Sequence, residues 1–259
     1  MIKRNTTYTK IKTIPEWVYK EAESRAEKLP IYFNSHRKEQ ANKIGCLGEV
    51  IAEEWMKRNK ITFKSALEET THDYLINDRL TIDVKTKDRT VAPRIDFDNS
   101  TPLYNHNHQK PNYFLFVSLQ REKNKKGNDI RNYHTAYIVG AISYEELNKI
   151  GIIFYKNEVD PRNKTKFWTD CINIQMSQLI STKETSRIFR GEITYPITDA
   201  EPDIDLIKQL NKWRESSTSF LKTTASGRWS WRQSYYLLNK WLSNFFRISK
   251  CVILKIPTE

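Results

Sequence analysis

The sequence predicts a protein of the α/β class, or α+β, with a mixed β-sheet that is flanked by helices. Two observations support this class. Helical periodicity fills most of about the first sixty residues, and the pattern then changes to short apolar strands. Further strands and a short helix follow before a helical C-terminal part. Elements in this order pack as layers around one core, and 259 residues suffice to bury it without staples.

The N-terminal part of the chain predicts two helices and a strand meander. Thr13 and an early proline predict a helix from Pro15 to Lys28, which Pro30 ends. A second helix is expected from about Arg37 to Asn59, where one apolar stripe recurs at three- and four-residue spacing: Ile44, Leu47, Ile51 and Trp55. Strands are then expected at 61–66, 73–76 and 80–87, with a tight turn at Asn77-Asp78.

The sequence of the rest of the chain predicts a loop, four strands and several helices. Residues 88–112 contain three prolines and little periodicity, so a long loop is expected. A capping box from Ser143 to Glu146 predicts a helix to Ile150, with Gly151 as its stop. The other expected elements are strands at 113–119, 135–141, 167–174 and 251–256, a boundary near 196–202, and helices at 205–221 and 230–246.

The charge balance favours a polyanionic partner. Lys and Arg number 43 against 31 Asp and Glu, a formal net charge of +12. No apolar run approaches the roughly 20 residues that a membrane span needs, and no secretory signal is visible, so no membrane partner is expected. The three cysteines, Cys46, Cys171 and Cys251, are far apart and form no metal-finger spacing, which favours a reduced, cytoplasmic setting.

Candidate chemistry lies on the hairpin that begins at Asp73. Strand alternation places Leu80, Ile82 and Val84 on one face and Thr81, Asp83, Lys85 and Lys87 on the other. Asp73 begins the neighbouring strand and can reach Asp83 across the turn. Two converging carboxylates form a hard-oxygen site that suits Mg²⁺. A lysine beside them can position an attacking water and neutralise charge on a phosphate.

A third carboxylate precedes this hairpin. Glu49 lies early on the second predicted helix, and the small residues Gly45 and Gly48 let that helix pack closely on the sheet. Glu53 is one turn further on the same face and is the alternate third ligand. A bare Asp-Xaa-Lys is common by chance, however. The plain alternative is a solvated strand face with an Asp83–Lys85 salt bridge.

The pattern of Glu49, Asp73 and Asp83-Val-Lys85 resembles the PD-(D/E)XK, or restriction-endonuclease-like, nuclease superfamily. In this comparison Glu49 matches the family's acidic residue on the first core helix, and Asp73 its first strand aspartate. Asp83 and Lys85 match the (D/E)XK element, whereas His72 stands where the family name has proline. The resemblance covers roughly residues 40–120. It implies a four-stranded mixed sheet flanked by helices and metal-assisted phosphodiester hydrolysis, with Mg²⁺, or Mn²⁺ in its place, at Glu49, Asp73 and Asp83.

Residues outside this set have weaker assignments. Lys87 and Gln109 could face the same site, and each is a phosphate contact or plain surface. The letters His-Asn-His at 106–108 lack the spacing of an HNH nuclease and are taken as coincidence. From residue 205 onward ten basic residues face three acidic ones. The candidate DNA contacts there are Arg228, Trp229, Arg232 and Lys240.

Together these observations predict an N-terminal helical arm (residues 1–35), a nuclease core (36–200) and a basic, aromatic C-terminal extension (201–259). The expected activity is Mg²⁺-dependent hydrolysis of double-stranded DNA by a site-specific endonuclease of restriction or homing type. A junction-resolving or repair nuclease and an RNA nuclease stay open. So does a non-catalytic DNA-binding protein on a nuclease fold. Many such nucleases are dimers, so a homodimer is also considered, although the sequence shows no dimerisation surface.

Overall fold

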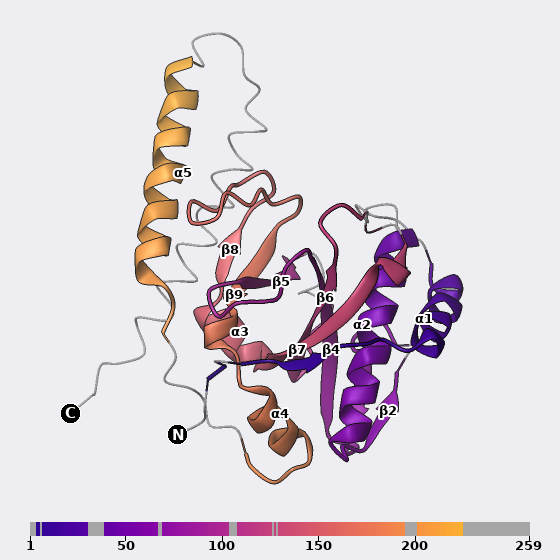
Figure 1. The fold of residues 1–259 in the computed structure, drawn as a ribbon. Helices are drawn as coiled ribbons and strands as arrows, with labels where there is room; N and C mark the ends of the chain where they lie inside the picture. The colour runs from indigo at the N-terminus through magenta and orange to yellow at the C-terminus, as the bar shows by residue number, and fades with distance from the viewer. Residues whose placement is uncertain are drawn as a thin grey trace, which may run out of the picture. The chain divides into compact units, whose positions relative to one another are not determined.

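The computed structural model describes residues 4, 5, 7–30, 39–66, 69–103, 108–125, 127, 129–194 and 201–224 (Figure 1). Contacts divide the chain into two units, Met1–Ile204 and Asp205–Glu259, which are described separately. The second unit is described through α5 (Ile204–Thr224), which confirms the helix expected at 205–221. The helix expected at 230–246, the strand expected at 251–256 and the four candidate DNA contacts lie outside the described residues.

The first unit is built from short strands and four α-helices within its described ranges. In chain order these are β1 (Thr9–Ile11), α1 (Glu16–Lys28), α2 (Glu39–Arg58), β2 (Phe63–Ser65), β3 (Tyr74–Ile76), β4 (Leu80–Arg89), β5 (Asp98–Pro102), β6 (Tyr113–Arg121), β7 (Tyr133–Ser143), α3 (Tyr144–Ile150), β8 (Ile152–Phe154), β9 (Cys171–Gln175) and α4 (Thr182–Phe189). Two short 3-10 helices, Ile130–Asn132 and Met176–Gln178, complete it.

Two sheets organise these elements. The larger has six strands in the order β1-β7-β6-β4-β3-β2, and the smaller has three in the order β5-β9-β8. Within the larger sheet β4 and β6 run parallel, and the other neighbours are antiparallel. The sheet is therefore mixed, as predicted, and wider than the four strands that the resemblance implies.

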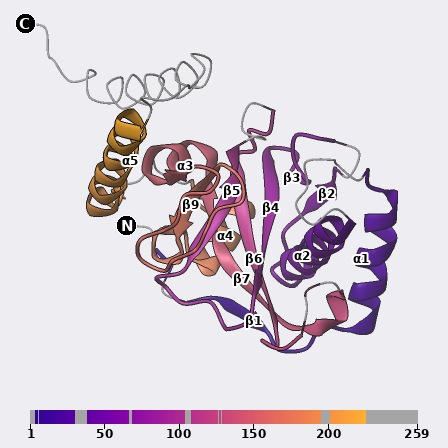
Figure 2. The same cartoon turned by 90° about the horizontal axis from the view of Figure 1, so that it is seen from above.

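The two faces of the larger sheet are covered by different layers (Figure 2). α1 and α2 pack on one face, where Ile51 and Trp55 share a core cluster with Ile82 and Val84 of β4. The small sheet and α3 cover the other face, where Phe114 and Phe116 of β6 share a cluster with β9 residues Ile172 and Ile174. Side-chain alternation along each strand produces this division.

Local sequence signals account for most boundaries. The α2 stripe at 44, 47, 51 and 55 is buried as predicted. Asn77 and Asp78 adopt φ of 49° and 53°, and the Arg79 N–H donates to the Ile76 carbonyl at 2.9 Å, which confirms the tight turn between β3 and β4. Ser143 accepts from the Glu146 N–H, and Gly151 ends α3, as its capping box predicts.

The long loop predicted over residues 88–112 is the main error. β4 continues to Arg89, and Asp98–Pro102 forms β5, whose polar sequence gives no strand signal. Its pairing with β9 supplies the strand geometry instead. β1, β8 and α4 were not anticipated either, and the strand expected from residue 167 begins only at Cys171. No helix in the described part of the chain is both long and apolar enough to cross a bilayer.

Candidate active site

The candidate site lies where β3 leaves the side of β4. Tyr74, the first residue of β3, pairs with Ile82, and the paired register does not extend to Asp73. The Asp73 N–H nevertheless donates to the Ile82 carbonyl at 2.9 Å. From Asp83 to Arg89, β4 pairs with β6 on its other edge. Within the described strands, the β3-side edge of β4 is therefore open beyond Ile82. Such an edge leaves main-chain groups available to side chains.

The carboxylate of Asp73 occupies the start of this edge. The Val84 N–H donates to Asp73 Oδ2 at 2.6 Å, in the position that a strand carbonyl would otherwise take. The hydrogen bond holds a partly buried carboxylate against the main chain of Val84, the residue that follows Asp83. Asp73 therefore lies beside the β4 main chain next to Asp83, and the charge of Asp83 acts on it.

Asp83 and Lys85 form a close, shielded pair. Lys85 Nζ lies 2.5 Å from Asp83 Oδ2, with side chains 18% and 3% exposed. Asp83 Oδ2 is buried and accepts no bond of hydrogen-bonding geometry, so the contact is ionic. The Lys85 ammonium also lies 5.9 Å from the centroid of the Phe114 ring. This burial contradicts the alternative of an ordinary solvated strand face, although the salt bridge itself is present.

Glu49 approaches from α2, which packs on the opposite face of β4. Gly48 makes that approach close, because a Cβ at this position would lie 1.9 Å from Thr86 Oγ1. The expected use of a small residue at the helix–sheet contact is confirmed at Gly48. Gly45 has more space, since the atom nearest to a Cβ at this position would be Glu49 Oε1 at 3.9 Å. Glu49 is partly buried and sits one residue beyond the contact.

Electrostatics link the three carboxylates. Burial and, to a lesser degree, the charge of Asp83 raise the pKa of Glu49 to about 7. Burial likewise raises the pKa of Asp73 well above its usual value, with added repulsion from Asp83 and then Glu49. Lys85 opposes both shifts. The three acids therefore sense one another as like charges in a poorly solvated site.

Glu53, the alternate third ligand, has another role in the structure. Both terminal nitrogens of Arg25 in α1 donate to Glu53, at 2.5 Å to Oε1 and 3.1 Å to Oε2. The Tyr74 hydroxyl donates to Glu53 Oε1 at 2.9 Å. Glu53 is 6% exposed, so this is a buried ion pair that ties α1 and α2 to the residue after Asp73. Glu49 remains as the third candidate carboxylate.

Gln109 points to the site as anticipated. Lys85 Nζ lies 3.5 Å from Gln109 Oε1, and Gln109 Nε2 donates to the Thr70 carbonyl at 3.1 Å. Next to it, His108 Nε2 lies 2.6 Å from Thr70 Oγ1 and is exposed. His106 is outside the described residues. The segments at Thr70 and Gln109 therefore meet beside Lys85.

Lys87 lies elsewhere and is not plain surface. Its Nζ donates to Ser100 Oγ of β5 at 3.0 Å. Burial and, after it, the charge of Arg89 lower the pKa of Lys87 to about 8, although Asp98 opposes the shift. Arg89, next on the same face, donates to the Asp98 carbonyl at 2.8 Å. Lys87 and Arg89, in the second half of β4, thus bind β5 of the small sheet.

The donor set suits a hard divalent cation, although it is not assembled as a finished site. No group of three or more His, Cys, Asp or Glu side chains in the described ranges is arranged to hold a metal ion. The candidate donors Asp73, Asp83 and Glu49 are nevertheless all carboxylates, which Mg²⁺ prefers. Their mutual repulsion and the buried Asp83 Oδ2 give a cation a favourable environment.

Sequence reasoning missed the supports of this site. Arg25 and Tyr74 hold Glu53, yet nothing in the spacing of α1 relative to α2 identifies Arg25 as a partner. The sequence suggests only that Arg25 forms a surface ion pair with Glu21, four residues earlier. That pair is also present, at 2.8 Å. The partners of Lys87 were missed because β5 was not predicted.

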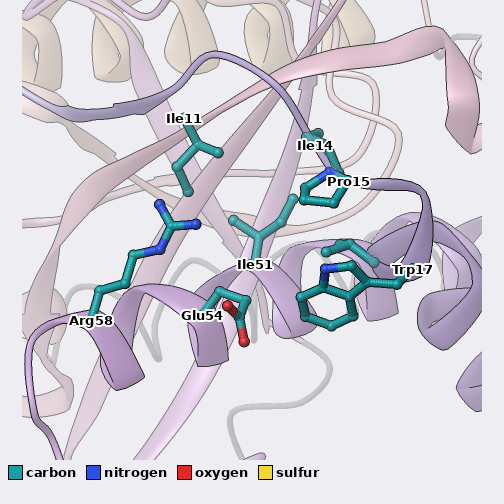
Figure 3. A pocket seen from close by; sticks show the side chains of 8 residues that line it. Ile11, Ile14, Pro15, Trp17, Ile51, Glu54 and Arg58 are labelled. Carbon is teal, nitrogen blue, oxygen red and sulfur yellow. The ribbon is translucent and has the colours of Figure 1, made fainter.

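A separate pocket lies on the helical side of the molecule (Figure 3). Its lining is mostly apolar and joins β1 and α1 to α2, with Glu54 and Arg58 among the lining residues. The full set is Ile11, Ile14, Pro15, Trp17, Val18, Ile51, Glu54 and Arg58. None of the candidate site residues lines this pocket.

Comparison with known proteins gives no further assignment. No model of a known protein family matches the chain, and no curated protein matches it. The site geometry and the sequence pattern therefore carry the functional argument.

Proposed function

We propose that this protein is a metal-dependent nuclease that hydrolyses DNA phosphodiester bonds, on a restriction-endonuclease-like core. The observation that carries the proposal is the juxtaposition at the open edge of β4. Asp73 accepts a hydrogen bond from Val84, the residue after Asp83, and Lys85 contacts Asp83. The charge of Asp83 acts on both Asp73 and Glu49. Three repelling carboxylates do not stabilise a structural core, whereas metal-assisted phosphodiester hydrolysis uses such a set of donors.

Each side chain has a proposed part in the reaction. Asp73 and Asp83 would hold Mg²⁺, and Glu49 would complete its ligands. The ion, when bound, supplies Lewis-acid polarisation of the phosphate and a more acidic water. Lys85 would position the attacking water and neutralise charge on the phosphate. Gln109, which contacts Lys85 Nζ, would keep the ammonium oriented when Asp83 turns to its ligand role.

The buried edge also supports a chemical role for Lys85 over a structural one. An ion pair in so shielded a place gives little net stability compared with apolar packing. A lysine at 18% side-chain exposure keeps limited access to solvent while its head group touches a carboxylate. This is the environment in which a cation acts most strongly on a nearby phosphate.

Site-specific cutting of double-stranded DNA is the proposed form of the activity. The formal charge of +12 favours a nucleic acid and does not choose between DNA and RNA. Incubation of the purified chain with supercoiled plasmid, in Mg²⁺ and in EDTA, tests the proposal. Metal-dependent discrete fragments would support a site-specific endonuclease, and nicked circles a nicking enzyme. Intact plasmid alongside cleaved RNA would replace DNA by RNA as substrate.

A non-catalytic nucleic-acid-binding protein is the candidate from another class. It predicts salt-sensitive binding of DNA and RNA without any cleavage in Mg²⁺ or Mn²⁺. The repulsion among Asp73, Asp83 and Glu49 speaks against it, since a site released from catalysis has no reason to keep this cost. Cleavage of neither nucleic acid, with binding intact, would favour it.

A further inference from the structure

The connection between β8 and β9 forms a basic surface, here named the basic arm (residues 155–170). Its path is fixed by its own hydrogen bonds. The Asn157 N–H donates to the Phe167 carbonyl at 2.7 Å, and the Phe167 N–H returns to the Glu158 carbonyl at 2.9 Å. Phe167 stacks on Phe154 of β8, with ring centroids 4.3 Å apart. The basic arm is therefore an ordered extension of the small sheet (beside β8 in Figure 1).

The fold separates the charges of the basic arm. Its composition is close to neutral, with Lys156, Arg162, Lys164 and Lys166 against Glu158, Asp160 and Asp170. Glu158 and Asp160 are only 7% and 0% exposed, however, and both have internal partners. Asp170 is partly buried and accepts from the Lys156 N–H at 2.7 Å.

The outward side of the basic arm is consequently cationic and aromatic. Lys156, Lys164 and Lys166 are all exposed. Trp168 is 62% exposed, more than any other exposed large hydrophobic residue among the described ones. Lys166 Nζ lies 5.6 Å from the Trp168 ring centroid. Solvent-exposed indole beside ammonium groups is the composition of a surface that tracks a nucleic-acid strand.

The basic arm lies on the same side of the larger sheet as Asp83 and Lys85 of the candidate site. Asp83, Lys85 and Lys87 share one face of β4, and Lys87 reaches Ser100 of the small sheet. From β5, Asp98 Oδ2 accepts from Arg162 of the basic arm at 2.9 Å. α1 and α2 lie on the opposite face (Figure 2).

We propose that the basic arm binds a strand of the substrate nucleic acid, with its lysines on phosphates and Trp168 stacked on an unpaired base. The proposal rests on the proposed function for its choice of DNA. An exposed tryptophan favours an unpaired base, because each base offers a stacking face only when it leaves the duplex. The basic arm would therefore hold a frayed or single-stranded stretch while the site acts on the same molecule.

The test is binding of a fluorescent single-stranded DNA oligonucleotide and of its duplex to the full chain in EDTA, so that no cutting occurs. Lys164→Ala with Lys166→Ala, and separately Trp168→Ala, are compared with wild type. The matched controls are Lys20→Ala and Trp17→Ala, which change exposed residues of α1 on the other face. Thermal melts of each variant confirm folding.

The lysine double variant should bind DNA about 10-fold more weakly. The slope of its binding constant against salt concentration should fall by the equivalent of one to two phosphate contacts. Trp168→Ala should weaken single-stranded binding by about 10-fold and duplex binding less, and Trp168→Phe should restore most of it. Control variants should match wild type. Unchanged binding by the arm variants, equal losses in the controls, or no binding by wild type would overturn the proposal. The assay needs no cleavage. A protein that binds DNA through the basic arm but does not cut it would therefore contradict the proposed function and still support the proposal for the basic arm.

Discussion

Asp73 and Val84 are joined by a 2.6 Å hydrogen bond from a main-chain N–H to a carboxylate oxygen, across the point where β3 leaves β4. The bond gives one carboxylate two tasks. It satisfies a strand donor that would otherwise lie open, and it holds Asp73 against the residue that follows Asp83. The geometry of the candidate site is therefore part of the structure of the hairpin.

This relationship predicts different effects for two substitutions of Asp73. Asp73→Ala removes the acceptor of the Val84 N–H and should destabilise the protein by about 1–3 kcal/mol. Asp73→Asn retains an acceptor oxygen and removes the repelled charge, so its free energy of unfolding should equal or exceed that of wild type. Urea denaturation at pH 7.5 compares the three proteins. Equal losses in both variants would show that the hydrogen bond contributes little.

Stability without metal should depend on the ionisation of Glu49. Its folded pKa of about 7 lies above its ordinary value, so its favourable contribution is complete at low pH and is lost as the pH rises through about 7. Glu49→Gln removes this loss of stability, because glutamine does not ionise. In EDTA the variant should therefore be more stable than wild type at pH 8, by about 1–3 kcal/mol, and similar to it at pH 4.5. A difference independent of pH would contradict the assigned pKa.

The contact of α2 with β4 should not tolerate a side chain at Gly48. The added Cβ would lie 1.9 Å from Thr86 Oγ1 and 2.9 Å from Thr86 Cβ, so helix and strand must move apart. Gly48→Ala should cost about 1–3 kcal/mol. Gly45→Ala is the matched control, because its Cβ meets nothing closer than 3.9 Å and alanine favours a helix. A stable Gly48→Ala protein would place α2 further from the sheet.

The Arg25–Glu53 pair should behave as one unit. Removing either partner leaves a buried charge, so Arg25→Ala and Glu53→Ala should each cost about 3–5 kcal/mol. The double variant should cost much less than their sum, since neither charge is stranded. Additive losses in a double-mutant cycle would show that the two side chains act independently.

The fold was predictable where one local signal decides the structure. The stripe from Ile44 to Trp55, the Asn77-Asp78 turn and the Ser143 cap each determine an element by their own chemistry. β5 was not predictable, because Asp98–Pro102 has no apolar alternation and becomes a strand only by pairing with β9. Elements that depend on distant partners leave no pattern of their own.

The candidate site shows the same division. Asp83 and Lys85 follow from alternation along one strand, and Asp73 follows from the hairpin register. Glu53 illustrates what spacing cannot decide. It shares a helix face with Glu49, yet Arg25 from another helix fixes it away from a ligand role. The burial of Lys87 depends likewise on β5, which local sequence did not reveal.

The most direct test of the nuclease proposal compares plasmid cleavage in Mg²⁺ by wild type, Asp83→Ala and Lys85→Ala. Lys64→Ala is a matched control, since Lys64 pairs with Asp78 on the exposed side of the same meander. We expect cleavage by wild type and Lys64→Ala, and none by Asp83→Ala or Lys85→Ala, with the fold and DNA binding of all variants largely kept. Cleavage at the wild-type rate by Asp83→Ala and Lys85→Ala would contradict the assignment of this site.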